Sequence, residues 1–386
     1  MDIIAYFDYI KLEDLNVSLE IKQNKYALYH IDKNLENSNI KNLNQYDIAI
    51  IGIPEERNTD NKGTAIAPDK IREKLYQLNS PESINIIDLG NLKSGKTLKD
   101  CYIAIADIVE ELISLSVIPL IIGGSQDLTY GNFLAYKNIS SKVNIVSIDS
   151  KLDIGFLTDD FNSSSYLGQI IMHNNENLFN YTNLGYQEYF LNKEEIELMN
   201  KLNFDSYRLG KIRSDIKEVE PILRDADILS VDISAVKQTE APGFNNPSAN
   251  GFYGEELCQL SRYAGLSDRL TSYGIYNVNP IYDINSQTVN LSAQVVWYFI
   301  EGVSQRQKDY PEGNLKNYTK FIVNFDNTEQ NIVFYHNVNN NRWWMEIPDS
   351  NKKMSNKIVA CTYKDYKLAC KHELPERWIR NLQKLR

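Results

Sequence analysis

Four short runs of apolar, largely β-branched residues constrain the fold of this 386-residue chain more than any other feature. Each run ends abruptly in small or polar residues. Continuous apolar runs of this length are typical of strands buried on both faces, as in a parallel sheet that helices cover. The sequence therefore predicts four such strands, at residues 47–54, 117–124, 143–149 and 227–232.

Stretches with helical periodicity separate these runs. Pro68 stands near the first turn of a helix expected to reach Leu75, and residues 98–115 carry apolar side chains at helical spacing. Strands that alternate with helices predict a doubly wound, mainly parallel α/β sheet. Ligands of such sheets bind at the carboxyl ends of the strands, so the residues directly after each run are the candidate site residues.

The C-terminal part of the chain has a different pattern. Residues 305–317 are polar and include Pro311 and Gly313, which is typical of a linker. We therefore expect an α/β domain at 1–304, a linker at 305–317 and a small α+β appendage at 318–386. The appendage is rich in aromatic residues and too small to bury them well alone, so we expect it to pack on the core or on a partner. Its expected elements are strands near 319–325, 331–336 and 342–347, then a helix over 363–385 interrupted by Pro375.

Charge and cysteine content exclude several classes of protein. The 41 basic and 51 acidic residues give a net charge of −10, which repels a phosphate backbone, so we expect no nucleic-acid partner. The four cysteines show no paired metal-ligand spacing and are too sparse for a disulfide scaffold. The longest apolar run, around Leu115 to Ile122, is far shorter than the ~20 residues of a membrane span, and the N-terminus lacks a basic signal-peptide region. These features predict a cytoplasmic protein that does not insert into a membrane.

Three motifs follow the second, third and fourth apolar runs. In this chain order they resemble Gly-Gly-Asp-His-Ser, Asp-Ala-His-x-Asp and Ser-x-Asp-x-Asp of the ureohydrolase family, which contains arginases, agmatinases and formiminoglutamases. The motifs here are Gly-Gly-Ser-Gln-Asp at 123–127, Asp-Ser-Lys-Leu-Asp at 149–153 and Asp-Ile-Ser at 232–234. Further landmarks of the family are matched at 52–54, 67–72, 88–90, 240–243 and 277–283. The resemblance covers about residues 45 to 302 and implies an arginase-type α/β sheet with two manganese ions held by His and Asp side chains.

The chain departs from this family at the implied metal ligands themselves. Of the six ligand positions, three keep their aspartates, Asp149, Asp153 and Asp232. The two histidine positions and the last aspartate position are occupied by Gln126, Lys151 and Ser234. A two-metal site must hold both ions about 3.5–4 Å apart. A Gln or Ser oxygen is a weak neutral ligand, whereas a Lys ammonium has no lone pair and brings a positive charge.

Two further positions belong to the expected pocket. Asn277 stands where the family has a glutamate that pairs with the guanidino-like group of the substrate. His173 lies at about the place of a substrate-contacting histidine loop, although an ordinary loop histidine is the simpler interpretation. The three aspartates also have a simpler interpretation, as helix caps after their strands, but the surrounding motifs favour a shared site.

The altered ligands predict that no cofactor is bound, with one divalent ion (Mn) at Asp149, Asp153 and Asp232 as the alternative. Three carboxylates and one ammonium leave two net negative charges, which one divalent ion would neutralise. If no ion binds, Lys151 is expected to serve as an internal cation that contacts the carboxylates, because three unpaired carboxylates would repel one another.

Three functions are consistent with this pattern. The main prediction is a pseudoenzyme, a catalytically degenerate ureohydrolase-fold protein with a binding, assembly or regulatory role through self-association or an unknown protein partner. The alternative is a metal-dependent C–N hydrolase of formiminoglutamase or arginase type with a one-metal or remodelled site, which needs at least three good ligands. A third possibility is a sensor that binds a small amine in the acidic pocket.

Overall fold

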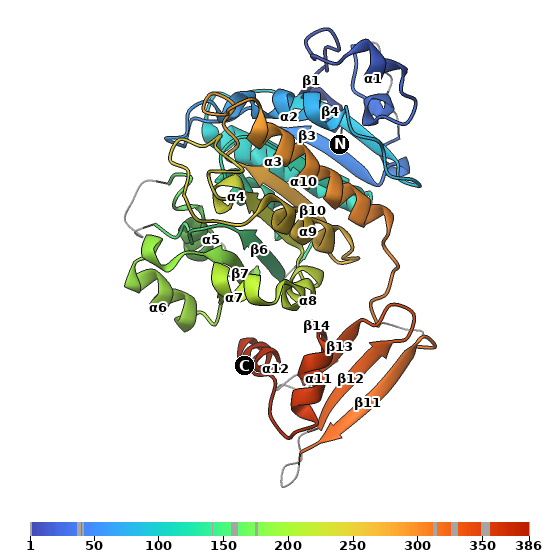
Figure 1. The fold of residues 1–386 in the computed structure, drawn as a ribbon, viewed down its shortest axis with the longest axis vertical. Coiled ribbons are helices and arrows are strands. Elements are labelled where there is room, and N and C mark those ends of the chain that lie inside the picture. Colours follow the sequence, from blue (N-terminus) through green and yellow to red (C-terminus); the bar gives the residue numbers. More distant parts are fainter. Residues whose placement is uncertain are drawn as a thin grey trace.

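A ten-stranded, mainly parallel sheet forms the centre of the computed structural model (Figure 1). The structure describes residues 2–36, 40, 42–140, 142–155, 161–173, 177–311, 315–325, 331–348 and 356–385. The strand order is β1-β4-β3-β5-β10-β9-β6-β7-β8, with β2 paired to β4, and among the described strands of this sheet β1–β4 is the one antiparallel pair. The strands are β1 (Phe7–Asp8), β2 (Asp32–Lys33), β3 (Ile48–Gly52), β4 (Ile86–Leu92), β5 (Ile118–Ile122), β6 (Val143–Ile148), β7 (Leu178–Tyr186), β8 (Asp205–Arg208), β9 (Ile228–Asp232) and β10 (Ser272–Tyr276).

Helices cover both faces of this sheet, which confirms the predicted doubly wound α/β architecture. Successive strand residues point to opposite faces, so Ile50 belongs to one hydrophobic core and Ile51 to the other. The first core packs against α2, α9 and α10, and the second against α3, α4 and α5. The helices of this part are α1 (Leu19–Gln23), α2 (Ala67–Leu75), α3 (Leu98–Ser114), α4 (Leu128–Leu134), α5 (Tyr166–His173), α6 (Lys193–Lys201), α7 (Leu209–Ser214), α8 (Glu220–Arg224), α9 (Gly254–Gly265) and α10 (Gln287–Ser304).

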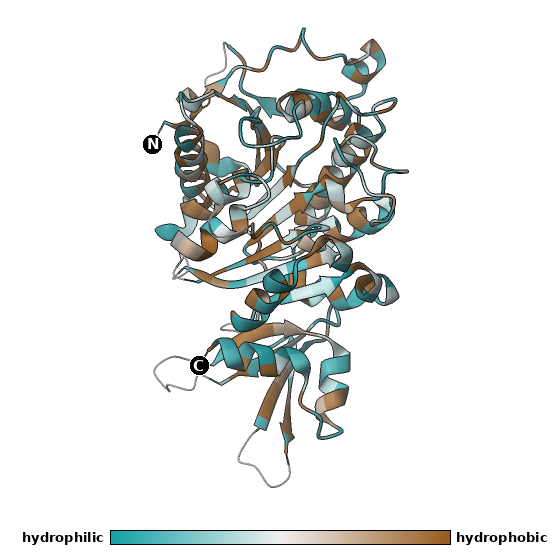
Figure 2. Ribbon diagram, turned by 90° about the vertical axis from the view of Figure 1, so that its left-hand side faces the viewer, coloured by the Kyte–Doolittle hydropathy of each residue, from teal (hydrophilic) through white to brown (hydrophobic). Residues whose placement is uncertain are grey.

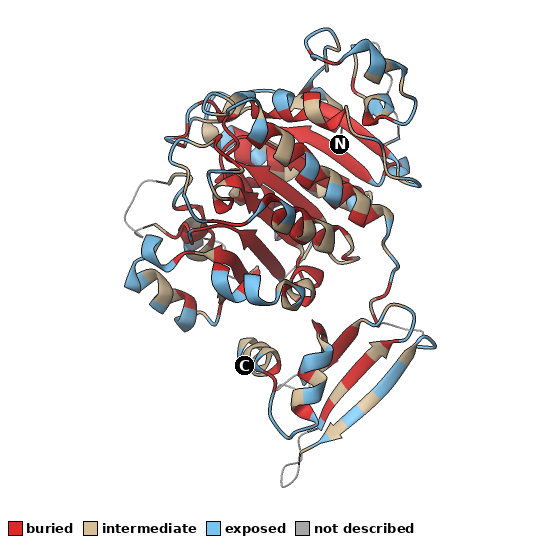
Figure 3. Ribbon diagram, in the orientation of Figure 1, coloured by how far each residue is buried: buried red, intermediate tan, exposed pale blue. Residues whose placement is uncertain are grey.

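Local sequence explains the central elements. All residues of β3, β5, β6, β9 and β10 are buried, as their continuous apolar runs require (Figure 3). Helix α3 begins with a capping box, in which Thr97 Oγ1 accepts from the Asp100 N–H at 3.2 Å and Asp100 Oδ2 accepts from the Thr97 N–H at 2.7 Å. Pro68 lies in the first turn of α2, where its missing N–H costs no hydrogen bond.

The C-terminal residues form a separate four-stranded antiparallel sheet with two helices (Figure 1). The sheet order is β11 (Tyr318–Asn324), β12 (Asn331–Asn337), β13 (Trp343–Ile347) and β14 (Lys357–Cys361), followed by α11 (Tyr363–Ala369) and α12 (Glu376–Lys384). The sequence did not predict β14. Pro375 stands at the N-cap of α12, where the expected interruption of the helix falls. We keep 1–304, 305–317 and 318–386 as the proposed division of the chain.

This appendage packs against the main domain. Arg224, which is buried at the end of α8, donates from Nη2 to the carbonyls of Trp343 and Cys361, each at 3.1 Å. Its guanidinium also lies 4.4 Å from the centroid of the Trp344 ring. Asp225 accepts the Ala360 N–H at 2.9 Å. These contacts agree with the expectation that the appendage docks on the core.

Hydrophobic residues gather on the strands and on the helix faces that meet them, whereas polar residues predominate on the outer helix faces (Figure 2). Among the described residues, none of the helices combines the length and the apolar character that a membrane span requires.

Candidate metal centre

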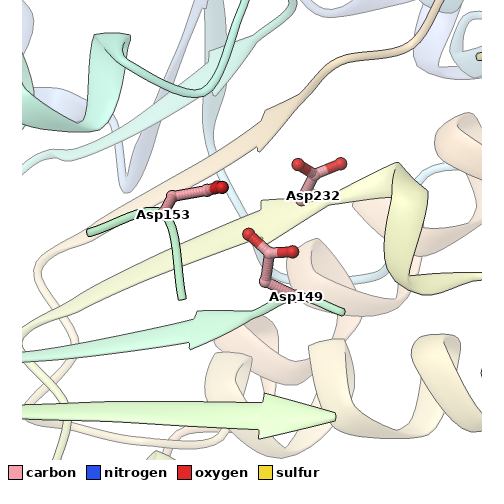
Figure 4. Close-up of side chains that lie close together, drawn as sticks. All are labelled: Asp149, Asp153 and Asp232. Atoms are coloured by element: carbon pink, nitrogen blue, oxygen red, sulfur yellow. The ribbon is translucent and has the colours of Figure 1, made fainter. Parts of the chain in front are cut away.

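Three aspartate side chains converge at the carboxyl edge of the main sheet (Figure 4). Asp149 directly follows β6 and Asp232 is the last residue of β9. Because β6 and β9 pair in parallel, with Ile148 opposite Val231, the two aspartates stand side by side. Asp153 faces them from the loop after β6. The three side chains place carboxylate oxygens within 4.8 Å of one another, and the residues are 1%, 3% and 8% exposed for Asp149, Asp232 and Asp153.

Backbone groups hold these side chains in place. Asp149 Oδ1 accepts the N–H of Lys151 at 2.9 Å, and Asp232 Oδ1 accepts the N–H of Ser234 at 2.7 Å. Asp153 has a φ of +51°, in the left-handed region that non-glycine residues seldom adopt. Its carbonyl accepts the N–H of Leu167 in α5 at 3.1 Å, which ties this strained residue to a helix.

Burial disfavours the ionised form of all three carboxyls, and repulsion from neighbouring carboxylates adds to this effect at Asp149 and Asp153. Burial, followed by the charges of Asp153 and Asp232, raises the pKa of Asp149 well above its usual range. Burial and the charge of Asp232 raise the pKa of Asp153 to about 7, and burial raises the pKa of Asp232. Such a group of carboxylates is stabilised when a cation lies between them.

Unpartnered oxygens show that the residues present fit a divalent cation. Asp149 Oδ2 and Gln126 Oε1 are buried and have no hydrogen-bond partner. Buried polar atoms are normally satisfied, so these two unpaired acceptors, one of them an oxygen of Asp149 itself, need an explanation. Carboxylate and amide oxygens are ligands that hard divalent ions prefer. Within the described part of the chain, this is the one group of three or more His, Cys, Asp or Glu side chains close enough to hold a metal ion.

Gln126 lies in the buried layer beneath the carboxylates. Its side chain is fully buried, and Nε2 donates to Ser147 Oγ at 3.2 Å and to the hydroxyls of Tyr166 and Ser230 at 3.4 Å each. None of these three hydroxyl residues was predicted from the sequence. A signal was available for two of them, because Ser147 and Ser230 each stand two residues before an aspartate that ends or directly follows the same strand, and such residues share a face.

Asn277 contacts the site directly. Its Nδ2 donates to Asp232 Oδ2 at 2.7 Å, and its Oδ1 is buried without a partner. A φ of +65° and two backbone hydrogen bonds hold it there: its N–H donates to the Gly124 carbonyl at 2.8 Å, and its carbonyl accepts from Asn61 Nδ2 at 2.8 Å. Nothing in the sequence distinguished Asn61 from the many other asparagines.

The structure does not place Lys151 among the carboxylates. Its side chain is exposed, and the ammonium lies 5.7 Å from the centroid of the Phe190 ring. No ion pair of 4.0 Å or less joins it to Asp149, Asp153 or Asp232, all of which are described residues. The expected internal cation is therefore wrong, because the loop turns the backbone N–H of Lys151 toward Asp149 and its side chain outward.

The two remaining predicted positions differ in what the structure describes. Ser234 contacts Asp232 through its backbone N–H, as the first residue after Ile233 in a short 3₁₀ turn. His173 is the last residue of α5, and its side chain falls outside the described residues.

Comparison with known proteins places this geometry in a family. The model of the arginase family matches residues 46–301, which is well over half of the chain. The chain belongs to the arginase family. This result confirms the ureohydrolase resemblance of the three strand-end motifs. The match ends just before the C-terminal end of α10, so the four-stranded appendage lies outside it.

Curated relatives of this arginase-family chain include formimidoylglutamases. The enzyme of Streptococcus gordonii is 23% identical over 320 residues, which cover 76% of this chain and 97% of the relative. The enzyme of Staphylococcus haemolyticus is 24% identical and the match covers 69% of this chain and 89% of the relative. These names favour the alternative prediction, a metal-dependent hydrolase, over the main prediction of a catalytically degenerate protein.

Solved structures share the fold. Formiminoglutamase of Trypanosoma cruzi, solved with Mn²⁺, superposes with a TM-score of 0.63 at 18% identity, over 69% of this chain and 96% of that one. Proclavaminate amidino hydrolase of Streptomyces clavuligerus gives a TM-score of 0.63 at 16% identity, over 73% and 97% of the two chains. The manganese in the trypanosomal structure contradicts the prediction that no cofactor is bound, because it shows this fold with the metal. The residues of this chain that could hold such an ion are the three retained aspartates, which are buried and lie close together.

Proposed function

We propose that this chain is a metal-dependent hydrolase that cleaves a C–N bond in a linear amidine or formimino compound, with manganese held by Asp149, Asp153 and Asp232. One observation carries the proposal: three buried carboxylates converge at the carboxyl edge of the sheet, and no basic side chain of the described residues forms an ion pair of 4.0 Å or less with them. The names of the formimidoylglutamase and amidino hydrolase relatives support this type of reaction.

The roles of the residues follow from their contacts. Asp149, Asp153 and Asp232 bind the ion, and the backbone N–H groups of Lys151 and Ser234 orient two of these carboxylates. When bound, a divalent ion supplies Lewis acidity and activates water for hydrolysis. Burial of the three carboxylates excludes bulk water from their inner side and strengthens their hold on a cation.

Asn277 is the residue best placed to receive the nitrogen end of the substrate. Its Nδ2 is engaged by Asp232, which leaves the unpartnered Oδ1 to accept a hydrogen bond from a substrate N–H. A neutral amide oxygen accepts such a bond without adding a fourth negative charge to the group. Asn277 thus both orients a metal ligand and contacts the substrate.

The test is an assay of the manganese-loaded protein on formimidoylglutamate and on a guanidino compound such as arginine. Hydrolysis of a formimino group adds one water and releases formamide and the free amine, and hydrolysis of a guanidino group releases urea. We expect one of these products from the parent chain and none above background from Asp149→Asn, while the exposed control Asp14→Asn keeps full activity. A folded, manganese-loaded parent that releases neither product would refute the proposed reaction.

A further inference from the structure

A cavity of about 50 Å³ lies between the appendage and the main sheet, toward the amino ends of its strands. Residues of β6, β7 and β8 line one side of it, and residues of β14 and α12 line the side that belongs to the appendage. One water molecule needs about 10–15 Å³ of such space, so the cavity has room for about four groups of that size. This is the size of a small tetrahedral oxyanion, and it is too small for a nucleotide or a peptide.

Basic side chains outnumber acidic side chains around this cavity. Its lining includes four basic residues, Arg269, Lys357, Arg377 and Arg380, and two carboxylates, Asp205 and Asp225. Four positive and two negative charges leave a formal charge of +2, in a chain whose net charge is −10. A cavity with an excess of positive charge in an acidic protein favours an anion as its ligand.

The two carboxylates of the lining already have partners within the protein. Asp205 pairs with Arg380 at 2.8 Å and with Lys384 at 2.6 Å. Asp225 accepts the N–H of Ala360 through both carboxylate oxygens, at 2.9 and 3.1 Å. Of the four basic residues of the lining, Arg380 is therefore engaged by Asp205, whereas the other three are not paired with either carboxylate.

Lys357 is the basic residue whose charge is least compensated. Its ammonium lies 3.4 Å from the centroid of the Phe179 ring, and none of the described carboxylates lies within 4.0 Å of it. Burial lowers the pKa of this lysine to about 7, which shows that the attraction of Asp225 and Asp227 does not offset the loss of water. An anion in contact with the ammonium would supply the missing negative charge.

Two arginines of the lining have N–H groups available for the same anion. Arg377 Nε, on α12, is buried without a hydrogen-bond partner, and its ion pair with Asp365 is long, at 3.7 Å. Arg269 of the main domain gives Nε and Nη2 to Asp227, at 3.1 and 3.5 Å, so this carboxylate does not use Nη1. A buried donor without an acceptor is costly, and an oxyanion in the cavity would remove that cost at Arg377.

We propose that this cavity is a binding site for a small tetrahedral oxyanion such as inorganic phosphate, held by Lys357 and Arg377 of the appendage and by Arg269 of the main domain. The site is separate from the candidate metal centre, because Asn144 at the cavity and Asp149 at the centre are five residues apart, or about 16 Å along the strand. The inference does not depend on the proposed hydrolase function. Because the binding groups come from both parts of the chain, the bound anion stabilises the docked appendage.

Calorimetric titration of the full-length protein with inorganic phosphate at pH 7 tests this inference. The protein is first freed of metal with a chelator, so that no Mn²⁺ binds the phosphate. We expect saturable binding of one phosphate per chain, with a dissociation constant of about 1 mM or lower. A reference titration with sodium chloride at the same ionic strength measures the effect of salt alone.

Substitutions of single lysines locate the binding. Lys357→Met removes the ammonium and keeps most of the stem, so we expect phosphate affinity to fall at least about tenfold. Lys357→Arg keeps the positive charge and should bind phosphate more tightly than Lys357→Met does. Lys371→Met is the matched control, because it changes the net charge equally at an exposed position of the appendage, and it should bind phosphate as the parent does.

Thermal melting gives a second measurement. Phosphate stabilises many proteins through general exclusion from their surface, and this effect should be equal in the parent and in Lys357→Met. Specific binding adds to it in the parent alone, so phosphate should raise the melting temperature of the parent more than that of the variant. Equal increments, equal phosphate affinity in the parent and Lys357→Met, or a folded parent without saturable phosphate binding would each overturn the site.

Discussion

Buried aspartates at the two edges of the main sheet differ in whether they have cationic partners. Asp153 at the carboxyl edge and Asp205 at the amino edge are both 8% exposed. Asp205 has two cationic partners from α12, with Arg380 Nη1 at 2.8 Å from Oδ1 and Lys384 Nζ at 2.6 Å from Oδ2. No described cation lies within 4.0 Å of Asp153 or of its neighbour Asp149.

The pKa values follow this difference. Burial alone would raise the pKa of Asp205, but Lys384 and Arg380 outweigh burial and lower it. Burial and Asp232 raise the pKa of Asp153 to about 7. At Asp205 the chain supplies its own cations, whereas at the candidate site no described cation forms an ion pair with the acids, so a cation from outside could do so. The account therefore predicts different consequences when each kind of acid is neutralised.

The largest expected effect is on metal binding. Asp149→Asn removes one of three charged ligands, so we expect the Mn²⁺ affinity to fall at least about 1,000-fold, or ~4 kcal/mol. The metal-free variant should melt no lower than the parent, because the substitution relieves repulsion among buried carboxylates. Mn²⁺ titration and thermal melting in chelator measure the two effects. Unchanged affinity would show that the carboxyl edge does not bind the ion through Asp149.

At the amino edge we expect a loss of stability without a loss of metal binding. Asp205→Asn leaves Lys384, whose side chain is 4% exposed, without its carboxylate, and should lower the free energy of unfolding by about 3 kcal/mol. Mn²⁺ affinity should stay at the parent value. Asp215→Asn is the control, because its contact with Lys364 is long, at 3.9 Å, and exposed, so its removal should cost less than about 1 kcal/mol. Denaturant unfolding curves that give Asp205→Asn and Asp215→Asn the same free energy of unfolding would contradict this expectation.

A smaller effect is expected from pH where Lys357 of the appendage lies beside Asp225 and Asp227 of the main domain. Burial, helped by Arg269, lowers the pKa of Lys357 to about 7, although Asp225 and Asp227 act in the opposite direction. In the unfolded chain this lysine titrates near its ordinary value of about 10.5. Between these values the unfolded chain holds the extra proton, so raising the pH from 7 to 9 should stabilise the folded state, by on the order of 1 kcal/mol.

Lys357→Met should remove this part of the pH dependence, because the variant has no proton to gain on unfolding. Lys371→Met, on the exposed surface of the appendage, is the control and should leave the pH profile unchanged. Chemical unfolding at pH 7, 8 and 9 measures the slope. Parallel profiles for the parent and Lys357→Met would mean that Lys357 is charged in the folded protein at pH 7 and above.

The smallest effect is expected at Lys151. An internal cation at this position would make Lys151→Met destabilising by about 1–4 kcal/mol. The exposed side chain seen here predicts a change within about 0.5 kcal/mol in chelator-treated buffer. A larger loss of stability, measured by the same unfolding curves, would indicate that the Lys151 ammonium pairs with the carboxylates. The two edges would then both supply cations to their buried acids.

The central strands could be predicted because burial on both faces demands continuous apolar runs, as in β5 and β6. Strand β7 escaped prediction because it carries polar side chains that tertiary hydrogen bonds satisfy. Asn183, for example, is fully buried and donates from Nδ2 to the Lys151 carbonyl at 2.6 Å, while its Oδ1 accepts the N–H of Tyr186 at 3.1 Å. No periodicity along the chain reveals such partners.

Prediction of the candidate site from the sequence is limited in the same way. The motifs brought Asp149, Asp153 and Asp232 to one edge because parallel strands end together. They did not indicate the direction of Lys151, which depends on how one loop turns. They also did not indicate the orientation of Gln126, which is set by hydroxyls on two other strands and on α5.

The most direct test of the central claim is a Mn²⁺ titration of the metal-free parent beside Asp149→Asn and Asp205→Asn. The account predicts saturable binding to the parent and to Asp205→Asn, although the latter is less stable, and loss of that binding in the stable Asp149→Asn. A folded parent without saturable Mn²⁺ binding, or an Asp149→Asn variant that binds as the parent does, would contradict it.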